Sequence, residues 1–475
     1  MMSRRPHQSR PRRLSLLDAT FLQIETRDTP MHVAALQVFQ LPKNAPADFI
    51  KNVVETLRAP AQLARPWNLK LAPVPLARLA PAMVETNDID MDYHVRHTCL
   101  PAPGGERELG ELVSHLHSTI LDRTRPLWTC HVIEGLENKR FALYTKIHHA
   151  LTDGVRGMQL LSGALGTRPG ANNWSPPWAA SPATAAGSRN GRKTDPAERP
   201  RRPALWRWPG LVAGAVTPLM RRRAAHEPIR VPFEAPPSIL NGRVTGARRV
   251  ATQRLDLARV KAVAARTGAS VNDVFLAICS SALRRHLADS GDLPDRSLIA
   301  GVPVSLRADV GDDESGNAVG FLWSVLGTEL AQPLARLAAV RQSMQASKQH
   351  LQALPGAVRP LFTMMTLTPA IAVLLSGQGA RLRPSMNVVI SNVPGPAKPL
   401  YLGRARMEAI YPVSIPLQGL GLNITCLSYD GQFTVGFTGG RDSVPHLQRI
   451  AVYADEALSE LESAASHAAD LKEAT

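Results

Sequence analysis

Cysteine is scarce in this chain of 475 residues, and no two cysteines form a CxxC pair. The four are far apart in the sequence: Cys99, Cys130, Cys279 and Cys426. This spacing excludes a dense disulfide framework and an ordinary zinc site, so we expect reduced thiols that are mostly packed in a core. A signal peptide is also lacking, because residues 1–13 are rich in arginine and no apolar segment follows them. A cytoplasmic protein is therefore expected.

Long hydrophobic runs and several common catalytic motifs are missing as well. The segment closest to a membrane span, residues 360–380, contains Pro369 and is diluted by threonine, serine and glutamine. We therefore expect a buried or lipid-facing helix pair there. The chain has no GxxxxGK or GxGxxG loop, no GxSxG nucleophile elbow and no HExxH metal motif. Nothing predicts a nucleotide cofactor, a bound metal or a covalent acyl-enzyme.

The formal net charge of +16 is concentrated in two segments. Residues 1–13 contribute +5, from five arginines and no acid, and residues 189–230 contribute +8, from eleven basic and three acidic residues. The rest of the chain is nearly neutral. The charge therefore belongs to a tail and a linker and not to a folded basic face, and nucleic acid is not an expected partner.

The composition divides the chain into four parts. Residues 1–13 predict a basic disordered tail. Over residues 168–240 the helix and strand periodicities give way to Pro, Ala, Gly, Ser and Arg, which predicts a linker between an N-terminal domain, 14–167, and a C-terminal domain, 241–475. The linker holds four of the seven tryptophans: Trp174, Trp178, Trp206 and Trp208. They suit either a segment that lies in a lipid headgroup layer or a tether that packs on its own protein.

The most informative stretch is KIHHALTDG, residues 146–154. PLWTCHVIEG and KRFALYTKIHH flank the turn residues Glu137 and Asn138 and are typical of two neighbouring strands, and a helical stripe begins at Val155. The histidines thus fall at a strand-to-helix loop, where scaffolds often present catalytic groups. Because adjacent strand residues point to opposite faces, one imidazole should be catalytic and the other supporting.

Helices and strands alternate in both halves of the chain. Helices are predicted at 105–123, at 258–267 before Gly268, from Ser270 onward and at 444–461; strands at 298–304 and 386–390; and a hairpin at Asp430-Gly431. This mixture predicts two α/β layers with a cleft between them.

The paired histidines allow more than one use. Zinc is disfavoured because no third His or Cys stands at ligand spacing. Loop histidines satisfied by backbone hydrogen bonds are the purely structural alternative. What remains is a general base near neutrality, suited to taking the proton of an incoming hydroxyl or amine while a good leaving group departs.

Further motifs accompany HHALTDG along the chain: PLW at 126–128, NDV at 272–274, PVSLR at 303–307 and SNVPGP at 391–396, with LLDATFLQIETRDTPMHV and DIDMDYHVRH before them. Together they resemble the bacterial wax ester synthase/diacylglycerol acyltransferase family of HHxxxDG acyltransferases, from about Leu16 to Leu461. The resemblance implies an α/β fold of two chloramphenicol-acetyltransferase-like, or condensation-domain-like, sandwich domains with an interface tunnel. Acyl-CoA would enter from one face and a lipid alcohol from the other.

The resemblance also implies roles for the HHxxxDG residues. His149 would take the acceptor's proton, with His148 in support. Asp153 would fix the loop by turning toward a basic partner, and Gly154 would permit the backbone turn and close substrate approach. Lys70 stands where the resemblance leads us to expect an arginine, and lysine lacks the planar fork that holds a carboxylate. The other candidate partners are Arg65, Arg96 and Arg307.

Polar residues of the C-terminal half are expected at the cleft. Asn272 is either a contact to substrate or the developing oxyanion, or a plain helix-start residue. Ser391 and Asn392 end a strand and line the cleft by the resemblance, with turn formation as the alternative. Ser270 and Asp273 form a capping pattern, so Asp273 is expected to start a helix and not to be a catalyst.

The expected function is esterification of a fatty alcohol or diacylglycerol by acyl-CoA to wax ester or triacylglycerol, with no covalent acyl-enzyme, no metal and no cofactor. A condensation-type enzyme with carrier-bound acyl groups and an amine or sugar hydroxyl acceptor is the alternative. A lipid-surface binding protein without activity is a third possibility. Lipid substrates and the Trp/Arg-containing linker predict peripheral association with the inner face of the membrane or with lipid inclusions.

Overall fold

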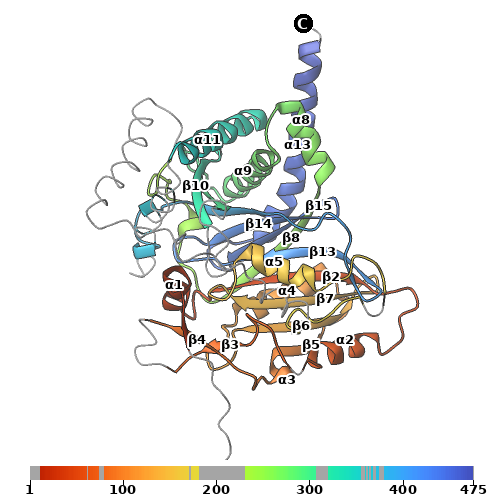
Figure 1. The fold of residues 1–475 in the computed structure, drawn as a ribbon. Coiled ribbons are helices and arrows are strands. Elements are labelled where there is room, and N and C mark those ends of the chain that lie inside the picture. Colours follow the sequence, from red (N-terminus) through yellow and green to blue (C-terminus); the bar gives the residue numbers. More distant parts are fainter. Residues whose placement is uncertain are drawn as a thin grey trace, which may run out of the picture.

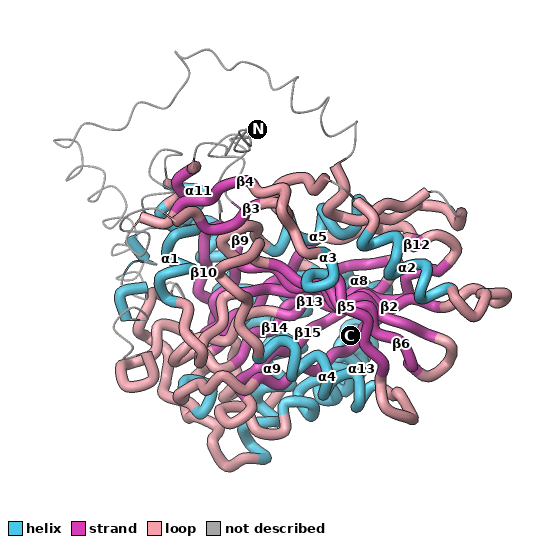
Figure 2. Tube along the Cα trace, turned by 90° about the horizontal axis from the view of Figure 1, so that it is seen from below, coloured by secondary structure: helices cyan, strands magenta, loops and turns pink. Residues whose placement is uncertain are grey.

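The computed structural model describes residues 11–60, 62–73, 80–170, 173–180, 230–305, 319–354 and 379–473, with a few positions between 359 and 373. Two six-stranded sheets organise the chain, and Figure 1 shows them one above the other. Seen from below, strands of both sheets run through the middle of the molecule and most helices lie toward the periphery (Figure 2). The α/β class predicted from the sequence is confirmed.

The first sheet has the strand order β12-β13-β2-β7-β6-β5. Its strands are β2 (His32–Gln40), β5 (Val95–Cys99), β6 (Trp128–Leu136), β7 (Arg140–His148), β12 (Tyr401–Leu402) and β13 (Ala405–Val413). β6 and β7 are the predicted neighbouring strands, and the turn between them holds Asn138 and Lys139 at positive φ. β2 pairs with β7 along its whole length and places His32 opposite His148.

β12 and β13 lie in this first sheet although residues 241–475 were predicted as a separate C-terminal domain. β13 pairs with β2, with Val413 opposite Ala34. Most of its side chains are buried, on both faces, and a strand that is apolar on both faces suits any covered sheet, so its local pattern does not specify which one. The predicted boundary therefore separates stretches of chain but not the two sheets.

The second sheet has the order β10-β9-β11-β14-β15-β8. Its strands are β8 (Arg248–Asp256), β9 (Ile299–Ser305), β10 (Val319–Val325), β11 (Val388–Val393), β14 (Leu422–Tyr429) and β15 (Gln432–Gly440). The hairpin predicted at Asp430-Gly431 joins β14 to β15, and both turn residues have positive φ, as a type I′ hairpin turn requires.

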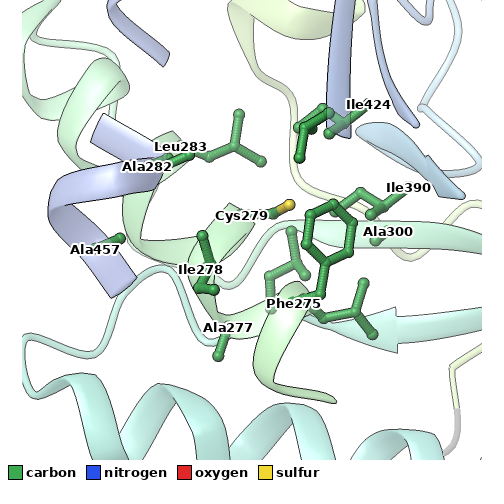
Figure 3. Close-up of a cluster of buried hydrophobic side chains, with 14 of the residues drawn as sticks. Phe275, Ala277, Ile278, Cys279, Ala282, Leu283, Ala300, Ile390, Ile424 and Ala457 are labelled. Carbon is green, nitrogen blue, oxygen red and sulfur yellow. The ribbon is translucent and has the colours of Figure 1, made fainter. Parts of the chain in front are cut away.

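Helices cover the second sheet and bury the main core. They are α8 (Leu257–Thr267), α9 (Val271–Asp289), α11 (Pro333–Ala353) and α13 (Leu447–Glu473), with a short 3-10 turn η3 (Ile239–Asn241) before the sheet. Phe275 and Ile278 of α9 pack in one cluster with Ile390 and Ile424 of the strands (Figure 3). Each such side chain contributes about 1.5–3 kcal/mol by burial. α8 ends at Gly268, which has φ of +63°, as predicted.

Further helices surround the first sheet: α1 (Leu16–Ile24), α2 (Phe49–Arg58), α3 (Met91–His94), α4 (Glu106–Ser118) and α5 (Gly154–Gly163). α4 ends before the predicted residue 123. The reason is Lys146 of β7, whose Nζ donates to the carbonyl oxygens of Leu116 at 2.8 Å and Thr119 at 2.6 Å. A buried amino group at a helix C-terminus donates to carbonyls that would otherwise be left unpaired, so the helix can stop there.

The predicted tail and linker are shorter than expected. β1 (Arg12–Arg13) pairs with β4 (Ala82–Glu85), whose other neighbour is β3 (Leu69–Leu71). Backbone pairing does not depend on the exposed arginine side chains. The arginine-rich composition therefore predicted a disordered tail that extends too far, to residue 13. In the linker, Trp178 is wholly buried and its Nε1 donates to the carbonyl oxygen of Leu57 at 2.8 Å. That part of the linker packs on its own protein.

Several sequence predictions concern residues that the structure does not describe. Residues 1–10, Trp206, Trp208 and most of 360–380 lie outside the described residues. Among the described helices, none alone is long and apolar enough to cross a membrane, and α8 and α9 pass that test only as a pair bent by 103°.

Cys130, Cys279 and Cys426 are buried, Cys99 is exposed, and all four thiols are unbridged.

Candidate active site

The loop between β7 and α5 carries the two histidines and is held by hydrogen bonds. The His149 amide donates to the carbonyl oxygen of Met31 at 2.8 Å, and the Leu151 amide donates to that of His148 at 2.9 Å. The Ala150 amide donates to Nδ1 of His148 at 3.0 Å. The loop is therefore a hydrogen-bonded turn whose conformation fixes where each imidazole lies.

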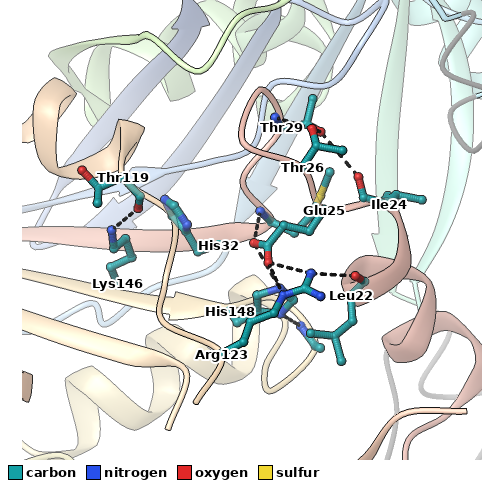
Figure 4. A network of polar contacts seen from close by, with 12 residues as sticks. Leu22, Ile24, Glu25, Thr26, Thr29, His32, Thr119, Arg123, Lys146 and His148 are labelled. Atoms are coloured by element: carbon teal, nitrogen blue, oxygen red, sulfur yellow. Dashed lines mark hydrogen bonds and ion pairs between the residues drawn. The ribbon is translucent and has the colours of Figure 1, made fainter. Parts of the chain in front are cut away.

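His148 is completely buried. Because its Nδ1 accepts the Ala150 amide, the neutral ring carries its proton on Nε2. That nitrogen faces Oε1 of Glu25 at 3.4 Å. Figure 4 shows the ring between the end of β7 and the segment that follows α1. His148 thus lies in a closed environment with Glu25 as its neighbour.

Glu25 is the centre of a buried polar network (Figure 4). Its carboxylate accepts the Met31 amide at 2.9 Å and two bonds from Arg123, from Nε at 3.0 Å and from Nη2 at 2.9 Å. Burial alone would raise the pKa of Glu25, but its bonds to His148, the Met31 amide and Arg123 together hold this pKa below its ordinary value. Glu25 is therefore ionised at neutral pH.

Sequence reasoning missed Glu25 and Arg123. Glu25 lies inside LLDATFLQIETRDTPMHV, and Arg123 lies just before PLW. Both stretches carry the family resemblance, but no spacing rule connects two residues that are 98 positions apart. Only the fold brings them together beside His148.

His149 has a different environment from its neighbour. It is half-buried, and the ring of Phe21 from α1 stacks on it with centroids 4.2 Å apart and an interplanar angle of 24°. Burial lowers the pKa of His149 to about 4. Among the described residues, its buried Nδ1 has no hydrogen-bond partner. The imidazole is thus neutral near pH 7.

Asp153 and Gly154 lie where the loop enters α5. Asp153 is buried and caps the helix, because its Oδ1 accepts the amide of Arg156 at 2.7 Å. Gly154 does not have a positive φ, and a Cβ placed there would meet no atom within 4 Å. The backbone at this position therefore needs no left-handed conformation, and a residue with a side chain could also adopt it.

The arginines considered as partners of Asp153 have other contacts. Arg65 forms an ion pair with Glu85. Nε of Arg96 donates to the carbonyl oxygen of Tyr93 at 3.0 Å. Arg307 lies outside the described residues. One contact that holds Asp153 in the loop is the helix cap, which involves neither of these two side chains.

Of the cleft residues predicted in the C-terminal half, two line a pocket and one does not. Asn272 begins α9, and its Oδ1 accepts a long hydrogen bond of 3.5 Å from Nδ2 of Asn392 in β11. Both side chains line a pocket of about 470 Å³, whereas Ser391 does not; adjacent residues of a strand point to opposite faces. Asp273 forms the predicted capping box with Ser270, so its role as a helix-start residue is confirmed.

A second buried network lies beside the histidine loop. Burial lowers the pKa of Lys146 to about 7 and that of His117 to about 3. One ring nitrogen of His117 lies 2.8 Å from the hydroxyl of Tyr144, and the other donates to the carbonyl oxygen of Ser414 at 2.8 Å. The network joins α4 to the residue after β13. In the described part of the chain, no three His, Cys, Asp or Glu residues are grouped to hold a metal ion.

Comparison with known proteins adds sequence relatives. Residues 14–275 match the wax ester synthase/diacylglycerol acyltransferase catalytic domain, and residues 315–462 match the C-terminal domain of the same family. The chain is 37% identical to the O-acyltransferase WSD of Acinetobacter baylyi over 98% of its own length and 100% of that protein. It is 40% identical to a Mycobacterium tuberculosis protein named probable diacyglycerol O-acyltransferase tgs2, over 94% and 98% of the two chains.

Solved structures agree with the sequence relatives. A wax ester synthase/diacylglycerol acyltransferase from Marinobacter aquaeolei VT8 matches with a TM-score of 0.77 and 35% identity, covering 96% of this chain and 100% of that one. The first condensation domain of the CDA synthetase shares the fold alone, with a TM-score of 0.56 and 15% identity, over 96% of each chain. With HHxxxDG in a structured loop between β7 and α5, the chain belongs to the wax ester synthase/diacylglycerol acyltransferase family.

Proposed function

We propose that this protein transfers a fatty acyl group from acyl-CoA to the hydroxyl of a fatty alcohol or a diacylglycerol, with His149 as the general base. The observation that carries the proposal is the state of this imidazole: neutral, half-buried against Phe21 and set in the HHxxxDG loop of a family member. A neutral imidazole accepts a proton at physiological pH, which an imidazolium does not.

The proposed reaction is a direct displacement. Nε2 of His149 takes the proton of the acceptor's O–H, and the oxygen attacks the thioester carbonyl carbon. As the tetrahedral intermediate collapses, the C–S bond breaks and the thiolate takes the proton from the imidazolium. The products are the ester and free CoA, and His149 returns to its neutral form. General-base help of this kind supplies about 10²–10⁴-fold, with the rest left to positioning and oxyanion stabilisation.

His148, Glu25 and Arg123 are proposed to position the catalytic loop. The carboxylate of Glu25 is bound to the Met31 amide, and the carbonyl of the same Met31 accepts the amide of His149. Glu25 therefore acts on the loop from two sides, through His148 and through Met31. Asp153 supports the far end of the loop as the cap of α5.

The remaining predicted residues are proposed to contact substrate. Asn272 and Asn392 face a pocket, and their amides suit hydrogen bonds to an acyl donor. Gly154 stands in open space, which allows close approach. We keep Ser391 as a proposed lining residue of a tunnel at the seam of the two sheets. Peripheral binding to a membrane or lipid droplet, on the cytoplasmic side, is proposed from the lipid nature of the acceptor.

The test measures free thiol release and ester formation by the purified protein. Palmitoyl-CoA is offered with hexadecanol or with dioleoylglycerol, and an acyl carrier thioester is offered with an amine in a parallel reaction. The proposal predicts thiol release that depends on the hydroxyl acceptor and gives wax ester or triacylglycerol. Turnover only with the carrier thioester and the amine would replace it by the condensation-type alternative. Acceptor-independent thiol release would contradict direct displacement.

A further inference from the structure

The pocket of about 470 Å³ lies where the chain leaves the second sheet. β11 ends at Val393, and Pro394, which lines the pocket, begins the crossover to β12 in the first sheet. The pocket is lined by apolar side chains together with Asn272 and Asn392. It therefore combines a hydrophobic surface with neutral hydrogen-bonding groups at the end of β11.

Two lysines line the same pocket. Lys261 comes from α8 and is exposed, and Lys348 comes from α11 and is half-buried. Lys348 also lines an adjoining polar cavity with Arg341, where Asp273 is the carboxylate. Within the described part of the chain, neither lysine forms an ion pair. Lys261 and Lys348 therefore bring two positive charges to the pocket, and Asp273 of the adjoining cavity is the carboxylate near them, so an anionic ligand would find a net positive site.

One buried hydrophobic cluster connects the region of the histidine loop with the strand that carries Asn392. α5 begins next to the loop at Gly154, and Leu161, seven residues on, is about 10 Å along the helix axis. Leu161 belongs to the same buried cluster as Val393, the neighbour of Asn392. The pantetheine arm of CoA has about a dozen bonds between the pyrophosphate and sulfur, which span ~14 Å at the reach of an extended chain.

From this arrangement we infer that the pocket holds the phosphate end of the acyl-CoA, with Lys261 and Lys348 on the phosphates and the two asparagines on the amides of the pantetheine arm. The inference rests on the proposed function, because it places one part of the proposed donor. Lipid phosphate headgroups share the same anionic chemistry, so the experiment must separate the two sources.

The test compares two thioesters that differ only in the phosphate-bearing part. KM is measured for palmitoyl-CoA and for palmitoyl-pantetheine, which lacks those phosphates, with the wild type and with the double variant K261A/K348A. The expected result is a rise of about tenfold in KM for palmitoyl-CoA, since charge-assisted contacts at a partly exposed site are worth about that much. KM for palmitoyl-pantetheine should stay unchanged. Lys51→Ala, an exposed lysine of α2, is the matched control.

A binding measurement makes the test independent of turnover. Equilibrium dialysis of free CoA against the purified protein should show about tenfold weaker binding by K261A/K348A and no change for Lys51→Ala. An unchanged affinity for CoA, or equal KM effects on both thioesters, would overturn the inference. So would a loss confined to binding of phosphatidate-containing vesicles, which would assign the lysines to lipid headgroups. Absence of turnover by the wild type with intact CoA binding would instead contradict the proposed function.

Discussion

Replacing Glu25 by Gln tests whether the buried network positions the catalytic loop. The amide side chain keeps the size of the carboxylate but removes its charge, so the two bonds from Arg123 lose their ionic partner. Breaking a buried ion pair from one side costs about 3–5 kcal/mol. Arg123 is 42% exposed, so water recovers part of this cost and we expect a loss of about 2 kcal/mol. The free energy of unfolding is measured by urea titration.

The same variant should slow catalysis. A small displacement of a positioned group lowers rates by up to about a hundredfold, so we expect kcat for palmitoyl-CoA and hexadecanol to fall about ten- to a hundredfold, with KM little changed. Glu55→Gln is the control, because Glu55 is exposed and its ion pair among the described residues is with Lys51, at 3.9 Å. A surface change of this kind stays within about 0.5 kcal/mol. Wild-type stability and kcat in Glu25→Gln would refute the positioning role.

The stability difference also has a predicted pH dependence. The folded protein holds the pKa of Glu25 below its ordinary value of 4.5, so the unfolded chain binds more protons in the acid range. The contribution of Glu25 is therefore fully present above the unfolded pKa and is lost as pH falls through the folded pKa. The wild type and Glu25→Gln should differ by a constant amount from pH 8 to about 5.5, and the difference should shrink in more acidic solution.

Three other changes test neighbouring parts of the account. Because burial lowers the pKa of His149 to about 4, kcat/KM should be level from pH 8 to about 5 and fall below that; an acid limb near 6.5 would contradict it. Phe21→Leu removes the aromatic ring that stacks on His149, so the acid limb of the kcat/KM profile should move to higher pH with KM unchanged. An acid limb at the wild-type pH would show that Phe21 does not lower the pKa of His149. Trp178→Ala should lower the free energy of unfolding by about 3–5 kcal/mol, because the indole is wholly buried and bonded to Leu57; a loss below ~1 kcal/mol would contradict its packing role.

Local signals predicted a large part of the fold. The capping box of Ser270 and Asp273, the stop at Gly268 and the hairpin at Asp430-Gly431 each depend on a few adjacent residues. Short-range hydrogen bonds and the left-handed backbone region decide such features, so a sequence pattern identifies them. The strands beside HHxxxDG were predicted for the same reason.

Long-range features were not predicted. The end of α4 depends on Lys146, and the placement of β13 depends on the free edge of β2. Glu25 lies in a stretch that carries the family resemblance, but nothing in that stretch indicates its contact with Arg123, 98 positions away. Contacts of this kind are set by tertiary packing, which local sequence propensities do not describe. The sequence therefore predicted the HHxxxDG residues of the site, but it did not predict Glu25 and Arg123, which contact the histidine loop.

The central claim is that the neutral imidazole of His149 removes the acceptor's proton. The most direct measurement is kcat of His149→Ala for ester formation from palmitoyl-CoA and hexadecanol, with His148→Ala and the thermal midpoint of each variant measured beside it. The account predicts a loss of about 10²–10⁴-fold for His149→Ala at an unchanged KM for palmitoyl-CoA and an unchanged midpoint. Ester synthesis by a folded His149→Ala at the wild-type rate would contradict it.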